Sequence, residues 1–153
     1  MCTFRLGFFG MYSQLLEIQV YTGEGYRPLV DFAGWRVAIL NYSSDLLPDR
    51  LTRMQRHNET DEVFVLLQGR CLLFVGTGED TVDSLHAADL EPGKVYNVRK
   101  GVWHTHTLSV DAKVLVVENR DTTYDNSPFT PLSAGQQEEL LLLTQSLWGC
   151  ADT

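Results

Sequence analysis

The stretch that decides the fold is Gln55-Arg56-His57-Asn58-Glu59-Thr60-Asp61-Glu62-Val63-Phe64-Val65-Leu66-Leu67-Gln68-Gly69. A histidine and a carboxylate flank a short polar loop, and an apolar strand follows that ends at a glycine. A second block, Gly101-Val102-Trp103-His104-Thr105-His106, comes later in the chain, after a Pro92-Gly93 turn. Together the two blocks can bring two imidazoles and a carboxylate to one point inside a β-barrel, which is the outline of a metal site.

Size and charge limit what such a site can belong to. The chain has 153 residues, enough for one domain with a sizeable core. Its 20 acidic and 12 basic side chains give a formal net charge of −8. A negative field repels phosphate backbones and anionic lipids, so we expect neither nucleic acid nor a membrane surface as a partner. We expect a small-molecule ligand instead.

The cysteines and the hydropathy pattern bear on the cellular compartment. Cys2, Cys71 and Cys150 are odd in number and show no motif spacing, which suits a reducing compartment. No run approaches the roughly 18 apolar residues that a membrane-spanning helix needs. We therefore expect a cytoplasmic protein.

Short apolar runs rich in β-branched and aromatic residues alternate with turn signals along most of the chain. This pattern is typical of an all-β barrel or sandwich. The predicted strands cover residues 15–21, 35–42, 51–57, 62–68, 70–75, 95–98, 102–110 and 113–118, with a short polar strand around Val82 and Leu85.

The C-terminal segment changes character and predicts a helix over residues 133–149. Ser133 and Gln136 have the spacing of a capping box, and Gly149 can end the helix. Its leucine-rich face is expected to pack on the barrel or on a second subunit. Residues 1–12 are expected to be a poorly ordered extension, and residues 13–153 a single domain.

The two blocks resemble the two motifs of the cupin superfamily, which are small double-stranded β-helix barrels of jelly-roll-like topology. The first family motif is His-x-His, three or four residues, Glu, six residues and Gly; here Gln55-x-His57 is followed by Glu62 and Gly69 at that spacing. The second is Gly, five residues, Pro-x-Gly, two residues and His; here it spans Gly93 to His104. The resemblance covers roughly residues 35–119.

Two positions depart from the family pattern. Arg99 replaces the usual proline, which mainly fixes a turn, and Gln55 replaces the first histidine. The resemblance implies that His57, Glu62 and His104 bind a divalent metal (iron, manganese, zinc or nickel), with Gln55 as a candidate fourth ligand. A carboxamide oxygen binds borderline metals more weakly than imidazole does. The alternative is a degenerate barrel whose histidines hydrogen-bond with Glu62 and hold no metal.

Two further side chains are expected to face the same interior. Because side chains two apart share a face of a strand, His106 points with His104, and Arg53 points with Gln55 and His57. His106 is a candidate proton shuttle, a fourth ligand or a packed core histidine. Arg53 is a candidate for binding a substrate carboxylate or phosphate, or else part of a salt bridge at the barrel mouth.

The resemblance implies a homodimer and a metal-dependent enzyme of isomerase, lyase or dioxygenase type. Its substrate would be a small polar metabolite such as a sugar or an organic acid. The barrel alone does not choose between these reactions, because one fold hosts many chemistries. The alternative is a non-catalytic small-molecule binding or sensing module with a degenerate metal site.

Overall fold

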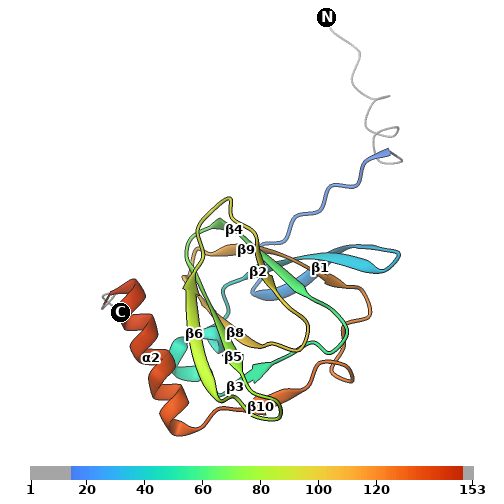
Figure 1. Cartoon of the computed structure of the whole chain (residues 1–153). Coiled ribbons are helices and arrows are strands. Elements are labelled where there is room, and N and C mark those ends of the chain that lie inside the picture. The colour runs from blue at the N-terminus through green and yellow to red at the C-terminus, as the bar shows by residue number, and fades with distance from the viewer. Residues whose placement is uncertain (1–14, 150–153) are drawn as a thin grey trace, which may run out of the picture.

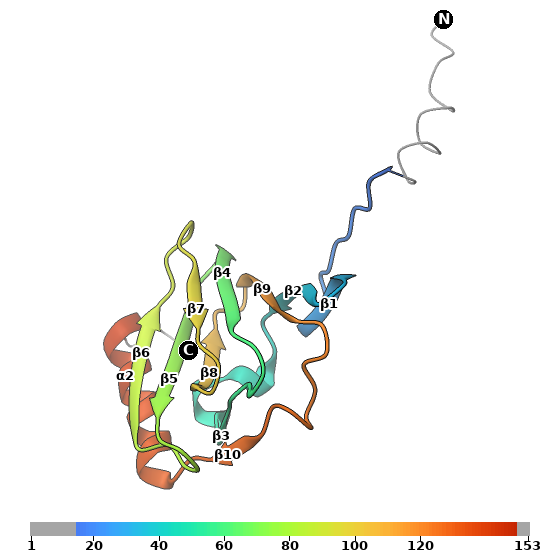
Figure 2. The same cartoon turned by 45° about the vertical axis from the view of Figure 1, so that its right-hand side comes forward.

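The structure, a computed structural model, describes residues 15–149. In this part of the chain the strands form two five-stranded antiparallel sheets (Figures 1 and 2). The first sheet has the order β1 (Gly25–Phe32), β2 (Trp35–Asn41), β9 (Lys113–Asn119), β4 (Glu62–Gln68) and β7 (Tyr96–Val98). The second has the order β10 (Phe129–Pro131), β3 (Arg53–Gln55), β8 (Trp103–Leu108), β5 (Cys71–Thr77) and β6 (Ser84–Asp89). Two short 3-10 helices, η1 (Ser44–Leu46) and η2 (Pro48–Arg50), lead from β2 to β3.

The all-β, jelly-roll-like architecture predicted from the sequence is confirmed. Alternate side chains of both sheets point inward and form one apolar cluster, which includes Phe64, Leu66, Leu73, Val114 and Val116. The predicted extension at residues 1–12 lies outside the described residues. The division into a single domain beginning at residue 13 stays a prediction.

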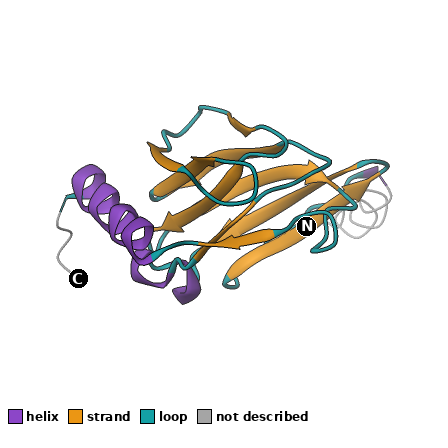
Figure 3. Ribbon diagram, turned by 60° about the horizontal axis from the view of Figure 1, so that its bottom comes forward, coloured by secondary structure: helices purple, strands orange, loops and turns teal. Residues whose placement is uncertain are grey.

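The predicted C-terminal helix is also confirmed, as α2 (Ala134–Trp148), which lies along the second sheet beside β6 (Figures 1 and 3). Ser133 and Gln136 form the predicted capping box, with bonds of 3.3 and 2.9 Å. Leu140 is fully buried in a second apolar cluster with Phe74 and Trp103, so the helix packs on the barrel. None of the helices within residues 15–149 is both long and apolar enough to span a membrane.

The predicted strand at residues 15–21 is wrong, and the first strand begins at Gly25 instead. Leu15, Ile18 and Val20 are more than two-thirds exposed, at 82%, 78% and 75%. An apolar alternation needs a sheet to pack against, and this segment has none among the described residues. The predicted strand at 51–57 shortens to Arg53–Gln55, and β10 was not predicted.

Gly69 makes the tight connection between β4 and β5, as expected. Its φ of +70° lies in the left-handed region, and a Cβ there would sit 2.6 Å from the Cα of Ala112. The position therefore needs glycine for both backbone conformation and space. This connection passes the chain from the first sheet to the second directly after the first motif.

Candidate metal centre

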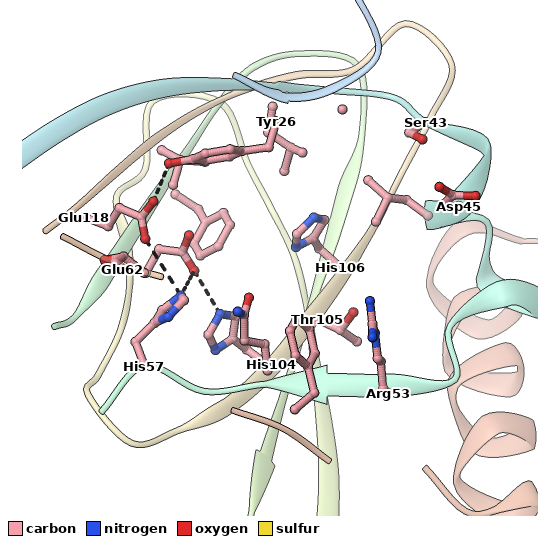
Figure 4. Close-up of a pocket in the computed structure, with 18 of the residues that line it drawn as sticks. Tyr26, Ser43, Asp45, Arg53, His57, Glu62, His104, Thr105, His106 and Glu118 are labelled. Atoms are coloured by element: carbon pink, nitrogen blue, oxygen red, sulfur yellow. Dashed lines mark hydrogen bonds and ion pairs between the residues drawn. The ribbon is translucent and has the colours of Figure 1, made fainter. Parts of the chain in front are cut away.

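Three buried side chains from separate elements converge inside the barrel (Figure 4). His57 follows β3, Glu62 opens β4, and His104 lies in β8. Glu62 Oε2 is 3.1 Å from His57 Nε2 and 2.8 Å from His104 Nε2. The candidate ligand atoms of the three residues all lie within 4.8 Å of one another, in a group that can hold a metal ion.

Backbone contacts between the two motifs bring these side chains together. The N–H of Gly101 donates to the carbonyl of His57 at 2.8 Å, which ties the glycine turn of the second motif to the first. Gln55 lies opposite His104 in the β3–β8 ladder. Asp61 Oδ1 accepts the backbone N–H of Lys100 at 2.8 Å, so the loop before Glu62 is anchored as well. The cluster is thus built by the motif spacing itself.

Hydrogen bonds to the far side of each ring fix the histidine tautomers. His104 Nδ1 is 3.0 Å from the carbonyl of Val102, and because a carbonyl only accepts, Nδ1 carries the hydrogen. His57 Nδ1 is 2.7 Å from Ser127 Oγ, whose own hydroxyl donates to Asn126 Oδ1 at 3.1 Å. His57 Nδ1–H therefore donates to Ser127. Both Nε2 atoms then present lone pairs to Glu62.

This arrangement fits a divalent metal. Glu62 Oε2 lies 3.1 and 2.8 Å from the two Nε2 atoms, and acceptor atoms this close repel each other unless a cation lies among them. Ligands about 2.1 Å from a metal and at right angles lie about 3 Å apart, which matches the observed spacing. Rings whose Nδ1–H is held by an oxygen acceptor are also the usual form of metal-ligating histidine. His57, Glu62 and His104 are therefore the residues that would hold the metal.

Without a metal, a proton takes the place of that cation. Burial by itself raises the pKa of Glu62, but the hydrogen bond from protonated His104, with the imidazole of His57 beside it, outweighs burial and lowers that pKa. Burial likewise opposes the charged form of His104, yet its bonds to Glu62 raise the pKa of the imidazole. The metal-free cluster is therefore a buried His104–Glu62 ion pair.

Two residues that the sequence reasoning missed extend the cluster. Glu118 of β9 is buried, with its Oε2 4.0 Å from His57 Nε2. Tyr26 of β1 donates its hydroxyl hydrogen to the other oxygen of Glu118 (Figure 4). Burial, with repulsion from Glu62, raises the pKa of Glu118. The inward position of Glu118 could have been inferred from strand alternation, because Glu118 falls on the same face of the strand as the buried Val114 and Val116.

Gln55 is half-buried and lines the same cavity as the cluster. Its Nε2 donates to the backbone carbonyl of Ser127 at 3.3 Å. The amide therefore helps to hold the loop that orients His57. Ligation of a metal by its oxygen stays a prediction.

His106 and Arg53 both line the cavity, as predicted from strand parity. His106 Nδ1 is buried and makes no hydrogen bond to any described residue. Burial lowers the pKa of His106 to about 4, so the ring is neutral at pH 7. Arg53 lies with its guanidinium carbon 4.2 Å from the centre of the Phe129 ring. Proton transfer by His106 and substrate binding by Arg53 stay predictions.

The cavity has a volume of about 990 Å³, enough for a metabolite of moderate size. Its lining combines charged groups with apolar walls that include Leu40, Phe64 and Val116. Figure 4 shows the cluster and Glu118 at one side, Arg53 and Asp45 at the other, and His106 between them. A ligand in this cavity can contact both ends.

Known proteins resemble this chain in structure and not in sequence. No protein-family model matches it, and no curated protein does either. A variant of Streptomyces Pac13 with uridine has a TM-score of 0.52 at 6% identity, covering 81% of this chain and 98% of that one. Pac13 described as a unique nucleoside dehydratase has a TM-score of 0.51 at 6% identity, covering 76% and 87%. A cupin-2 domain containing protein of Shewanella frigidimarina has a TM-score of 0.46 at 19% identity, covering 73% and 92%.

These likenesses concern the fold alone. The chain has the cupin fold that its two motifs predicted, a β-barrel similar to that of Pac13, with one C-terminal helix on the barrel. Within that fold it carries a His–Glu–His cluster able to hold a metal ion. The fold neighbours include an enzyme, Pac13.

Proposed function

We propose that this chain is a metal-dependent enzyme acting on a small polar metabolite, with the metal held by His57, Glu62 and His104. The observation that carries the proposal is the convergence of both Nε2 lone pairs on Glu62 Oε2, at 3.1 and 2.8 Å. A divalent metal bound there would act as a Lewis acid on a substrate oxygen.

The surrounding residues support chemistry at that point. The Tyr26 hydroxyl bonded to Glu118 can hold a proton beside the cluster, at the tyrosine oxygen or at the carboxylate. The ring of His106, which burial keeps neutral at pH 7, lines the cavity beside them. Leu40, Phe64 and Val116 exclude water from one wall, which strengthens each of these polar contacts. Isomerase, lyase and dioxygenase reactions all use such a set of groups.

A non-catalytic binding or sensing module is the second candidate. It is favoured by Gln55 in place of the usual histidine and by the His104–Glu62 ion pair, which closes the cluster without a metal. In that case the cavity holds its ligand without turnover. The cytoplasmic location, the small-molecule partner and the homodimer stay predictions for either function.

Elemental analysis of untagged protein purified without chelator separates the two candidates. We expect close to one metal ion per chain in the wild type and none in a His57→Ala/His104→Ala variant. His86→Ala is the matched control, because His86 is exposed on β6 and away from the cavity. Its metal content should equal that of the wild type. A wild type that binds no metal even after reconstitution would refute the enzyme and favour the binding module.

A further inference from the structure

We infer that the substrate is an extended anion. Its carboxylate or phosphate lies against Arg53, and a hydroxyl or carbonyl oxygen at its other end lies at the metal cluster. This inference rests on the proposed function, because it assigns a substrate class to the same cavity. It predicts sugar phosphates or sugar acids ahead of neutral sugars and ahead of two-carbon acids.

Arg53 is oriented without using its hydrogen-bond donors. The guanidinium lies over Phe129 at 4.2 Å, and Phe129 in turn packs against Tyr124 at 5.8 Å between ring centres. Stacking fixes the plane of a guanidinium while its N–H groups remain free for a planar or tetrahedral anion. The side chain is exposed to the cavity rather than buried in the wall.

Within the described part of the chain, no carboxylate neutralises Arg53. The two other arginines that line the cavity are engaged, since Arg36 pairs with Asp31 at 3.3 Å and Arg50 donates to the carbonyl of Ser44 at 3.2 Å. Asp45 lines the same side of the cavity as Arg53 (Figure 4), but no ion pair joins them. In a chain of net charge −8, a cation left free in a cavity is a candidate anion site. The salt bridge at the barrel mouth, the alternative drawn from the sequence, is not formed.

The sheet register gives the length of the ligand. Gln55 pairs with His104 in antiparallel strands, so Arg53 and His106 belong to the next inward-facing row, two residues away. Two residues of a strand span about 7 Å, so the backbone rows that carry Arg53 and His104 lie about that far apart. At about 1.5 Å per covalent bond a two-carbon acid is too short to contact both ends, whereas a five- or six-carbon chain is not.

The ring of His106 also lines the cavity, between the cluster and Arg53 (Figure 4). Its Nδ1 is buried in the wall and makes no hydrogen bond to a described residue, so the rest of the ring is what a ligand can contact. The cavity thus offers the metal cluster, the ring of His106 and a guanidinium without a carboxylate partner.

Calorimetric titration of metal-loaded protein tests the inference with four probes: glucose, glucose 6-phosphate, gluconate and inorganic phosphate. We expect glucose 6-phosphate or gluconate to bind at least about tenfold more tightly than glucose, because hydrogen bonds to charged groups are the stronger ones. Whichever of the two anions binds more tightly tells whether the group held is a phosphate or a carboxylate. The Arg53→Gln variant should remove that preference. Arg27→Gln, which changes an exposed arginine of β1 outside the cavity, should retain it.

Three results would overturn the inference: equal affinity for glucose and the anions, wild-type affinity in Arg53→Gln, or no binding of any anionic probe at millimolar concentrations. A fourth result would be that inorganic phosphate binds as tightly as glucose 6-phosphate in both the wild type and Arg53→Gln. That result would show that the metal holds the anion, and it would overturn the inference as well. Metal content measured on the same samples distinguishes the two proposals. Full metal without dependence on Arg53 refutes only the substrate class, and absence of metal refutes the enzyme.

Discussion

Replacing Ser127 by alanine would remove the hydrogen-bond acceptor of a candidate ligand while leaving all the ligands in place. Ser127 is 1% exposed, and its Oγ lies 2.7 Å from His57 Nδ1. The same hydroxyl donates to Asn126 Oδ1 at 3.1 Å, which leaves its lone pairs to accept the Nδ1 hydrogen. In Ser127→Ala the proton of His57 is free to move to Nε2, the atom that must be unprotonated to bind metal.

The size of the effect follows from these two bonds. Loss of an outer partner of a ligating histidine lowers metal affinity about 10- to 100-fold, which corresponds to about 1.4–2.8 kcal/mol. The metal-free fold should lose about 1–3 kcal/mol as well, because the buried His57 Nδ1–H loses its acceptor, whereas Asn126 Oδ1 keeps the backbone N–H of Thr123 at 2.9 Å. Alanine is smaller than serine, so no clash adds to this.

Competition of Co²⁺ or Zn²⁺ binding against a chromophoric chelator measures the affinity directly, and circular dichroism checks the fold. Ser84→Ala is the control, because Ser84 also loses a side-chain hydrogen bond, to Thr77 at 2.7 Å, but lies on β6 away from the cluster. Its affinity should stay within about twofold of the wild type. A folded Ser127→Ala protein with wild-type affinity would refute the assigned tautomer and the metal role of His57.

Three further predictions concern stability, each measured by urea unfolding. Gly93→Ala and Gly69→Ala both force alanine into a left-handed backbone, at a cost of about 1–2 kcal/mol. Only Gly69 would also clash with Ala112, so Gly69→Ala should be the more destabilising by a clear margin; equal losses would contradict the crowding. Burial lowers the pKa of His106 to about 4, against about 6.5 when unfolded, so the stability it confers is present above pH 6.5 and is lost as the pH falls toward 4. Between pH 7 and pH 5 the free energy of unfolding of metal-free His106→Phe should therefore fall by about 1–2 kcal/mol less than that of the wild type. Equal losses in the two proteins would show that the His106 ring takes up protons without unfolding. Ser133→Ala should cost about 1 kcal/mol through loss of the helix cap, and no change would mean that the capping box contributes nothing.

The strands that carry the two motifs could be predicted closely, because both their ends and their faces are marked in the sequence. Residues 62–68 are an uninterrupted apolar run between two polar ends, and they form β4 with those bounds. The first strand could not be predicted, and the reason is physical. Residues 25–32 include Pro28, and the pairing register shifts directly after it. An edge strand tolerates both features, but in the sequence a proline at this position favours a loop. The apolar run at 15–21 had the better pattern, but it pairs with no strand within residues 15–149.

The candidate ligands could be predicted and their supporting residues could not. His57, Glu62 and His104 stand at spacings that the family motifs fix along the chain. Ser127 comes from a loop before β10, and its contact with His57 depends on how distant segments close. Glu118 carried a usable signal, since its parity with buried valines places a carboxylate inside the barrel. The general lesson is that a charged residue at an inward position of an apolar strand points to a polar site.

Two carboxylates are buried at one point, so the cluster needs positive charge beside them. Glu62 and Glu118 are 8% and 7% exposed, and both lie close to His57. Uncompensated buried charge is far more costly than the fold can sustain, so positive charge must enter the cluster in one form or another. A divalent metal supplies it while both rings stay neutral. In its absence a proton on His104 supplies it to Glu62, while Glu118 has Arg36 Nη1 at 4.0 Å and accepts a hydrogen bond from Tyr26. Metal loading and protonation are therefore alternatives at the same atoms, and metal affinity should fall as the pH drops through the raised pKa of His104.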